Sequence, residues 1–160
     1  MSRPPLRPRP LIKKINSNKY KKRMNQLCYL PKMDHIVKIE SIDDRESLCI
    51  YYNQLRSLFP KRIQSNESEQ IFTYMIPLIH ELVSRNPTFN VYLHLEGLRI
   101  KDLLEIKSLV INSVTFFDQF VNRRLDHCYV VRAPCHVDNL FNMIKPLINK
   151  HTKEKIVFVN

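Results

Sequence analysis

Apolar and polar positions follow two different periods along the chain, and each change of period marks a predicted element. Residues 66–85 carry apolar side chains three or four positions apart, which predicts an amphipathic helix that Pro77 should kink. Residues 89–95 alternate apolar and polar side chains, which predicts a strand with its apolar residues on one face. The elements predicted after this strand are a helix over 102–121, a strand over 127–132, a helix over 137–148 and a strand over 155–159.

Two short apolar runs precede this alternation. Residues 36–39 and 48–52 are rich in β-branched or aromatic side chains, and a charged turn at 43–45 separates them. They therefore predict two antiparallel strands. The second run could instead open a helix that extends to Phe59, and periodicity alone does not decide between the two.

Together these elements predict an α/β fold with a mainly parallel sheet. Helices and strands alternate from residue 66 onward, and parallel strands joined by helices require right-handed crossovers. We expect residues 89–95, 127–132 and 155–159 to be neighbouring parallel strands. The predicted domain covers residues 34–160.

Residues 1–33 differ from this domain in both charge and composition. They hold ten of the 26 Lys and Arg residues and none of the 15 acidic residues, so the net charge of +11 belongs mainly to this segment. Four prolines lie within residues 2–10, which disfavours a helix and favours an extended, solvated chain. The sequence therefore predicts a basic, Pro-rich, disordered tail.

The cations of the tail are candidates for binding an anionic partner. The residues concerned are Lys13, Lys14, Lys19, Lys21, Lys22 and Arg23. An anionic membrane surface and a nucleic acid are both suitable partners, and the cluster over 19–23 could also act as a nuclear localisation signal. The remaining alternative is that the tail only keeps the protein in solution.

Several classes of protein are excluded by composition. Gly97 is the only glycine, whereas a P-loop, a dinucleotide-binding turn and a nucleophile elbow each need several glycines. The chain has no apolar stretch of the roughly 18 residues that a transmembrane helix requires, and no secretory signal. We therefore expect a cytoplasmic protein, peripheral to membranes or nuclear if the tail directs it there, with reduced cysteines.

Two groups of side chains could carry chemistry. His127, Cys128, Cys135 and His136 are potential zinc ligands, but neighbouring strand residues point to opposite faces, so we expect core cysteines and no metal site. His94 lies on the same strand face as Glu96 and could act as an acid or base, yet no nucleophile accompanies it. The sequence thus predicts no catalytic residue, no cofactor and no enzyme activity.

Four segments resemble the CRAL-TRIO lipid-binding domains over residues 36–160. Residues 124–134, R-L-D-H-C-Y-V-V-R-A-P, resemble the strand that leads to the Asn-Ala-Pro signature of that family. Residues 144–148 and 153–159 are similar to its K-P-(L/F)-(I/L) helix end and its closing K-I-V strand. Residues 91–98 are similar to its D-x-E-G-L strand end, with His94 in place of the aspartate, which is closer to the divergent BCH-like branch.

The sequence departs from the family pattern at two motifs. Residues 121–123 replace the aromatic-Pro-Glu motif, and Arg132 replaces the asparagine of Asn-Ala-Pro. We also expect a short form that lacks the family's N-terminal helical module and its C-terminal lid helix. On that basis we expect a shallow groove or a protein-binding surface rather than a deep closed cavity.

The resemblance implies a non-catalytic module that binds a lipid or another hydrophobic small molecule. Its ligand would lie between the sheet face that carries Tyr92 and His94 and a flanking helix, with Arg132 and Lys155 near its polar end. The alternative from a different class is a BCH-like scaffold that binds a protein partner. A weaker alternative is a nucleic-acid-associated protein that acts through its tail.

Overall fold

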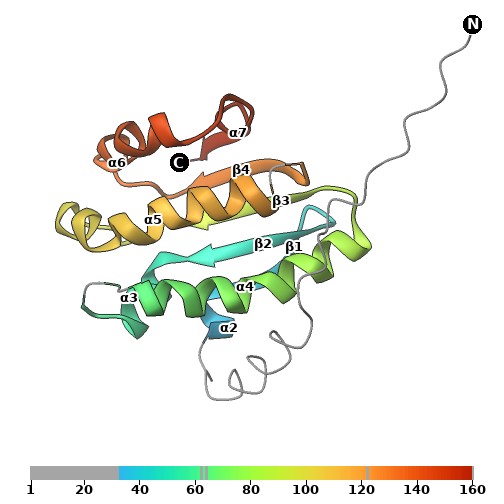
Figure 1. Cartoon of the computed structure of the whole chain (residues 1–160), viewed down its shortest axis with the longest axis horizontal. Coiled ribbons are helices and arrows are strands. Elements are labelled where there is room, and N and C mark those ends of the chain that lie inside the picture. The colour runs from blue at the N-terminus through green and yellow to red at the C-terminus, as the bar shows by residue number, and fades with distance from the viewer. Residues whose placement is uncertain (1–32, 62, 64, 122, 160) are drawn as a thin grey trace, which may run out of the picture. The chain divides into compact units, whose positions relative to one another are not determined.

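The computed structural model describes residues 33–61, 63, 65–121 and 123–159. These residues form one five-stranded sheet with a layer of helices (Figure 1). In chain order the elements are α2 (Met33–Ile36), β1 (Val37–Ile42), β2 (Arg45–Tyr51), α3 (Tyr52–Leu58), α4 (Ser65–Arg85), β3 (Phe89–His94), α5 (Ile100–Phe120), β4 (Leu125–Val131), α6 (Val137–Ile144), the 3₁₀ helix η1 (Lys145–Leu147), α7 (Lys150–Lys153) and β5 (Ile156–Val159).

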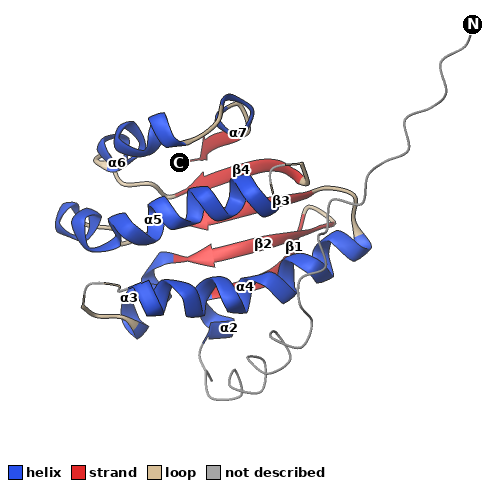
Figure 2. Cartoon of the chain, viewed as in Figure 1, coloured by secondary structure: helices blue, strands red, loops and turns tan. Residues whose placement is uncertain are grey.

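The sheet topology confirms the predicted α/β class. The strands lie side by side in chain order, β1 is antiparallel to β2, and every other neighbouring pair is parallel. Helices α4, α5 and α6 connect β2 to β3, β3 to β4 and β4 to β5. Because each crossover is right-handed and leads to the next strand in the same direction across the sheet, all three helices lie on the same face of the sheet (Figure 2). The predicted neighbours 89–95, 127–132 and 155–159 correspond to β3, β4 and β5.

Three element boundaries differ from the predictions for local reasons. The apolar run over 48–52 was predicted to be a strand or the start of a helix, and the structure contains both. Strand β2 ends at Tyr51, and helix α3 begins at Tyr52. Helix α5 begins at Ile100 rather than Asp102, since Arg99 and Asp102 form a reciprocal capping box there. The helix predicted over 137–148 stops at Ile144 and continues as the 3₁₀ turn η1, which contains Pro146.

A buried carboxylate joins α3 to the start of α5. Asp102 is fully buried and accepts hydrogen bonds from the backbone and the side chain of Arg99, each at 3.1 Å. Arg56 of α3 pairs with Asp102 at 3.5 Å and with Glu105 at 2.5 Å. Burial acts to raise the pKa of Asp102, but the hydrogen bonds from Arg99 outweigh it and hold this pKa below its ordinary value.

The predicted tail lies almost wholly outside the described residues. Residues 1–32 are not described, and with them all six tail cations named above. Met33, the last residue of the predicted tail, is fully buried in α2 and belongs to the packed domain. The three described cysteines, Cys49, Cys128 and Cys135, are free thiols.

Candidate functional site

A cavity of about 210 Å³ lies between the sheet and the helix layer. Its floor is the sheet face formed by alternate residues of the parallel strands, such as Val91, Leu93 and Val130. Its other walls come from α4, α5 and α6. The helix side chains that line it include Ile71, Phe72 and Met75 of α4, Ile106, Leu109, Val110, Ser113, Val114 and Phe117 of α5, and Leu140, Phe141 and Ile144 of α6.

The surface of this cavity is apolar. Among the described residues that line it, no nitrogen or oxygen atom is exposed to its interior. The Ser113 hydroxyl, on a lining residue, donates instead to the Leu109 carbonyl within the same helix, at 2.7 Å. An apolar cavity of about 150 Å³ can stay dry and bind benzene, so this one has room for a larger hydrocarbon group.

Two phenyl rings line the cavity at the edge of the sheet. Phe141 of α6 and Phe158 of β5 form an edge-to-face pair with ring centroids 5.4 Å apart. Both residues line the cavity, and Phe158 is 41% exposed because β5 is an edge strand. The Phe141–Phe158 pair therefore forms the part of the cavity wall that lies at the exposed edge of the sheet.

The candidate zinc ligands do not converge. Cys128 lines the cavity, and burial raises the pKa of its thiol to about 12, so the thiol stays protonated. His127 stacks on Tyr129, with ring centroids 5.7 Å apart, on the opposite face of β4. Cys135 is exposed after the end of β4. In the described part of the chain, no group of three His, Cys, Asp or Glu side chains could hold a metal ion.

Tyr92 and His94 lie on the sheet face that points away from the cavity. Neither residue lines the cavity, whereas Val91, Leu93 and Leu95 between and beside them do. Tyr92 stacks on Tyr129 with centroids 4.8 Å apart, and His94 stacks on Tyr51 at 4.4 Å. The predicted ligand position over these two residues is thus a different place from the cavity.

His94 and Glu96 do not form an acid–base pair. Glu96 accepts a hydrogen bond from Arg132 at 3.0 Å. The Nε2 atom of His94 is buried and has no hydrogen-bond partner among the described residues. Burial lowers the pKa of His94, so its imidazole is neutral at pH 7.

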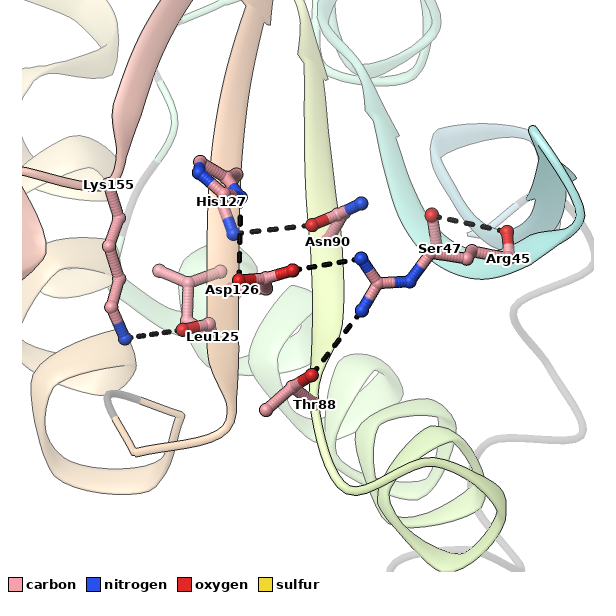
Figure 3. Close-up of polar contacts among 8 residues, drawn as sticks. All are labelled: Arg45, Ser47, Thr88, Asn90, Leu125, Asp126, His127 and Lys155. Atoms are coloured by element: carbon pink, nitrogen blue, oxygen red, sulfur yellow. Dashed lines mark hydrogen bonds and ion pairs between the residues drawn. The ribbon is translucent and has the colours of Figure 1, made fainter.

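Arg132 and Lys155 lie at opposite ends of β4 and do not form one polar end. Arg132 follows the last residue of β4 with a positive φ of 51° and donates a backbone hydrogen bond to Val159. Lys155 precedes β5, and its Nζ donates to the carbonyl of Leu125, the first residue of β4 (Figure 3). Because β4 and β5 are parallel, the register sets these two cations a strand length apart. Their role in ligand binding stays a prediction.

The residues that line the cavity were predicted only as the buried faces of helices and strands. Val110, Val114 and Phe117 belong to the apolar stripe of α5, and the stripe itself was predicted. A stripe that packs tightly and one that leaves a cavity have the same helical spacing. No signal in the sequence separated them.

Comparisons with known proteins bear on the whole domain. The chain is similar to the protein in the crystal structure of Sfh5, with a TM-score of 0.66 at 17% sequence identity. That match covers 87% of this chain and 56% of Sfh5, so the chain spans little more than half the length of that protein. A search of curated proteins finds no match. Within the described residues, no helix has the length and apolar character to cross a bilayer.

A family model matches the whole of the described domain. The model of the CRAL/TRIO domain matches residues 32–160, which include all five strands and the cavity between sheet and helices. The two-layer arrangement and the parallel order of β2 to β5 agree with the fold shared with Sfh5. The chain belongs to the CRAL/TRIO domain family, whose members bind lipids or other hydrophobic ligands.

Proposed function

We propose that this domain binds the hydrocarbon part of a lipid or of another hydrophobic small molecule in the cavity between its sheet and helices. The observation that carries the proposal is the cavity itself, about 210 Å³ in volume with no polar atom exposed to it among the described lining residues. An empty space of this size in a close-packed interior is destabilising, and an apolar ligand would restore the lost contacts.

The walls of the cavity favour a particular kind of ligand. Sites that hold a whole drug-sized molecule are usually about 300–1,000 Å³, which is larger than this cavity. A polar group inside it would lose its hydration without gaining a hydrogen bond, at a cost of roughly 2 kcal/mol or more. The ligand therefore places a chain or an unsubstituted ring inside, and its polar group stays at the surface.

We further propose that the domain is not an enzyme. His94 is stacked on Tyr51, Glu96 is paired with Arg132, and both lie away from the cavity. Catalysis by proton transfer needs an acid or base within reach of the bound molecule. Among the described residues, no carboxylate, imidazole or amine side chain lines the cavity, and the Cys128 thiol that does so stays protonated.

We propose that the basic tail determines where in the cell the domain acts. Ten Lys and Arg residues without an acidic residue would recruit the domain to anionic surfaces such as a membrane. A BCH-like scaffold remains the second candidate, because the sheet face away from the helices carries Tyr51, Tyr92 and Tyr129, a residue type enriched in protein interfaces.

Native mass spectrometry of the full chain, purified without detergent, tests the ligand proposal. A bound hydrophobic molecule that leaves on organic extraction, and that returns when the lipid extract is added back, supports it. A chain that stays empty after exposure to fatty acids, phospholipids and sterols contradicts it. A stoichiometric protein partner on an empty domain would favour the scaffold.

A further inference from the structure

The two edges of the sheet differ in how well they are protected against pairing with another strand. Because the strands lie side by side in chain order, β1 and β5 are the edge strands. Strand β1 carries the charged residues Lys38 and Glu40, and charged side chains on an edge strand oppose its association with another chain. Strand β5, Ile156–Val159, contains no charged residue, no proline and no bulge. The β5 edge is therefore open to a further strand.

Apolar side chains are exposed on both faces of β5. Val157, Phe158 and Val159 are 37%, 41% and 40% exposed. Successive residues of a strand point to opposite faces, so Phe158 lies on the cavity side of the sheet and the two valines lie on the other side. A partner lying on one face would cover only one of these two sets. A partner strand that extends the sheet would cover both.

Hydrogen bonds within the sheet determine which backbone groups of β5 point outward. Arg132, which follows β4, donates its backbone N–H to the carbonyl of Val159 at 3.1 Å. In a parallel pair of strands, alternate residues direct their N–H and C=O groups toward the neighbouring strand. The odd-numbered residues of β5 therefore bond to β4. The backbone N–H and C=O groups of Ile156 and Phe158 point away from β4, toward the open edge.

A second copy of β5 is complementary to this edge. Two copies related by a two-fold axis perpendicular to the sheet pair antiparallel, and each residue lies opposite one that points to the same face. One register opposes the three exposed residues to one another. It places Phe158 opposite Phe158 of the second copy, where the outward backbone groups of both residues can exchange hydrogen bonds, and Val157 opposite Val159 of the second copy. No charged side chains meet in this register.

We propose that two copies of this chain pair through β5 and form a dimer in which one sheet continues across the two-fold axis. The surface that pairs is only four residues long on each copy, so we expect a reversible dimer with a dissociation constant on the order of micromolar. Closure by a two-fold axis uses up both β5 edges, which limits the assembly to a dimer.

The pairing would also complete the wall of the cavity. Phe158 lines the cavity and packs edge to face against Phe141, with ring centroids 5.4 Å apart. In the dimer, Phe158 of the second copy would lie against this part of the wall. Only this consequence for the ligand rests on the proposed function. The pairing itself rests on the exposure of β5 and on the direction of its backbone groups.

Analytical ultracentrifugation of the full chain, stripped of ligand and at physiological salt, measures the dimer dissociation constant. Val157→Lys adds a charge to β5 on the side away from the cavity, and Ser41→Lys adds the same charge at an exposed position of β1 as the matched control. The two-fold axis places the first substitution in the interface twice. We therefore expect the dissociation constant to rise at least about tenfold in Val157→Lys and to stay unchanged in Ser41→Lys.

Two results of this measurement would overturn the proposal. One is a chain that remains monomeric at the highest soluble concentration, including a chain whose β5 edge pairs with a different protein. The other is a Val157→Lys dimer as tight as that of the unaltered chain, which would place the interface elsewhere. Since ligand is removed beforehand, neither result bears on whether the cavity binds a hydrophobic molecule, which a fatty acid titration measures separately.

Cysteine cross-linking tests the register without disrupting the interface. Val157→Cys and Val159→Cys are made separately in a chain with Cys28 and Cys135 replaced by serine, and the two are mixed under oxidising conditions. Residues opposed without hydrogen bonds have Cα atoms about 4.5 Å apart, which a disulfide can span. We expect a cross-linked dimer from the mixture and little from either variant alone. A mixture without cross-links, or Val157→Cys alone cross-linking as fast, contradicts the proposed pairing.

Discussion

Filling the cavity with a side chain of the protein should abolish ligand binding without unfolding the domain. Val114 lines the cavity from the middle of α5, and Val114→Phe would direct a phenyl ring into it. A benzene-sized group fits an apolar cavity of about 150 Å³, so the ring would occupy much of the 210 Å³. The cavity offers no other room for a hydrocarbon chain.

The magnitude follows from the volume. At about 24 cal/mol per Å³, an empty cavity of 210 Å³ costs up to about 5 kcal/mol of folding free energy. Inserting a larger side chain costs about 1–3 kcal/mol where the fit is imperfect. The free energy of unfolding of the empty domain should therefore stay unchanged or rise by about 1–3 kcal/mol, which is opposite to the usual effect of a core substitution.

Two measurements on the same protein test this reasoning. Titration with the fluorescent fatty acid cis-parinaric acid reports binding, and urea denaturation reports the free energy of unfolding. Val157→Phe is the matched control, since Val157 lies on the opposite face of β5, does not line the cavity and is 37% exposed. We expect affinity to fall at least about tenfold in Val114→Phe alone, because that loss corresponds to only about 1.4 kcal/mol. Unchanged binding by a folded Val114→Phe domain would place the ligand elsewhere.

Three further predictions concern charged groups. Asp102→Asn should destabilise the domain by about 1–3 kcal/mol, because it removes the buried charge that accepts hydrogen bonds from Arg99, whereas exposed Asp138→Asn should change the free energy of unfolding little. Burial lowers the pKa of His94 below its ordinary value of 6.5, so as the pH falls the imidazole takes up a proton in the unfolded chain before it does so in the folded one. The free energy of unfolding should therefore be unaffected by His94 above pH 6.5 and should decrease below that pH. Urea titrations at several pH values should show a smaller decrease in His94→Phe. A chain that begins at Lys32 should lose the salt-sensitive part of its binding to anionic vesicles or nucleic acid, and competition between the two would rank them; equal salt sensitivity of the shortened and full chains would exclude a binding role for the tail.

Much of the architecture followed from local periodicity. Alternation over 89–95 and helical spacing over 66–85 are properties of the backbone that every folded context preserves, so the elements were predicted nearly at their true bounds. The handedness of the crossovers then left few topologies open, and the parallel order of β3, β4 and β5 was among them. Boundaries failed where capping or Pro146 acted over a few residues.

The location of the candidate site was decided only by tertiary structure. Alternation shows that a strand has two faces, yet Tyr92 and His94 were assigned to the ligand although the helices cover the other face. Strand register separated Arg132 from Lys155, which the family resemblance had placed together. The cavity depends on how far side chains of α4, α5 and α6 reach toward the sheet. That distance is set by the packing of whole layers, to which no local pattern in the sequence corresponds.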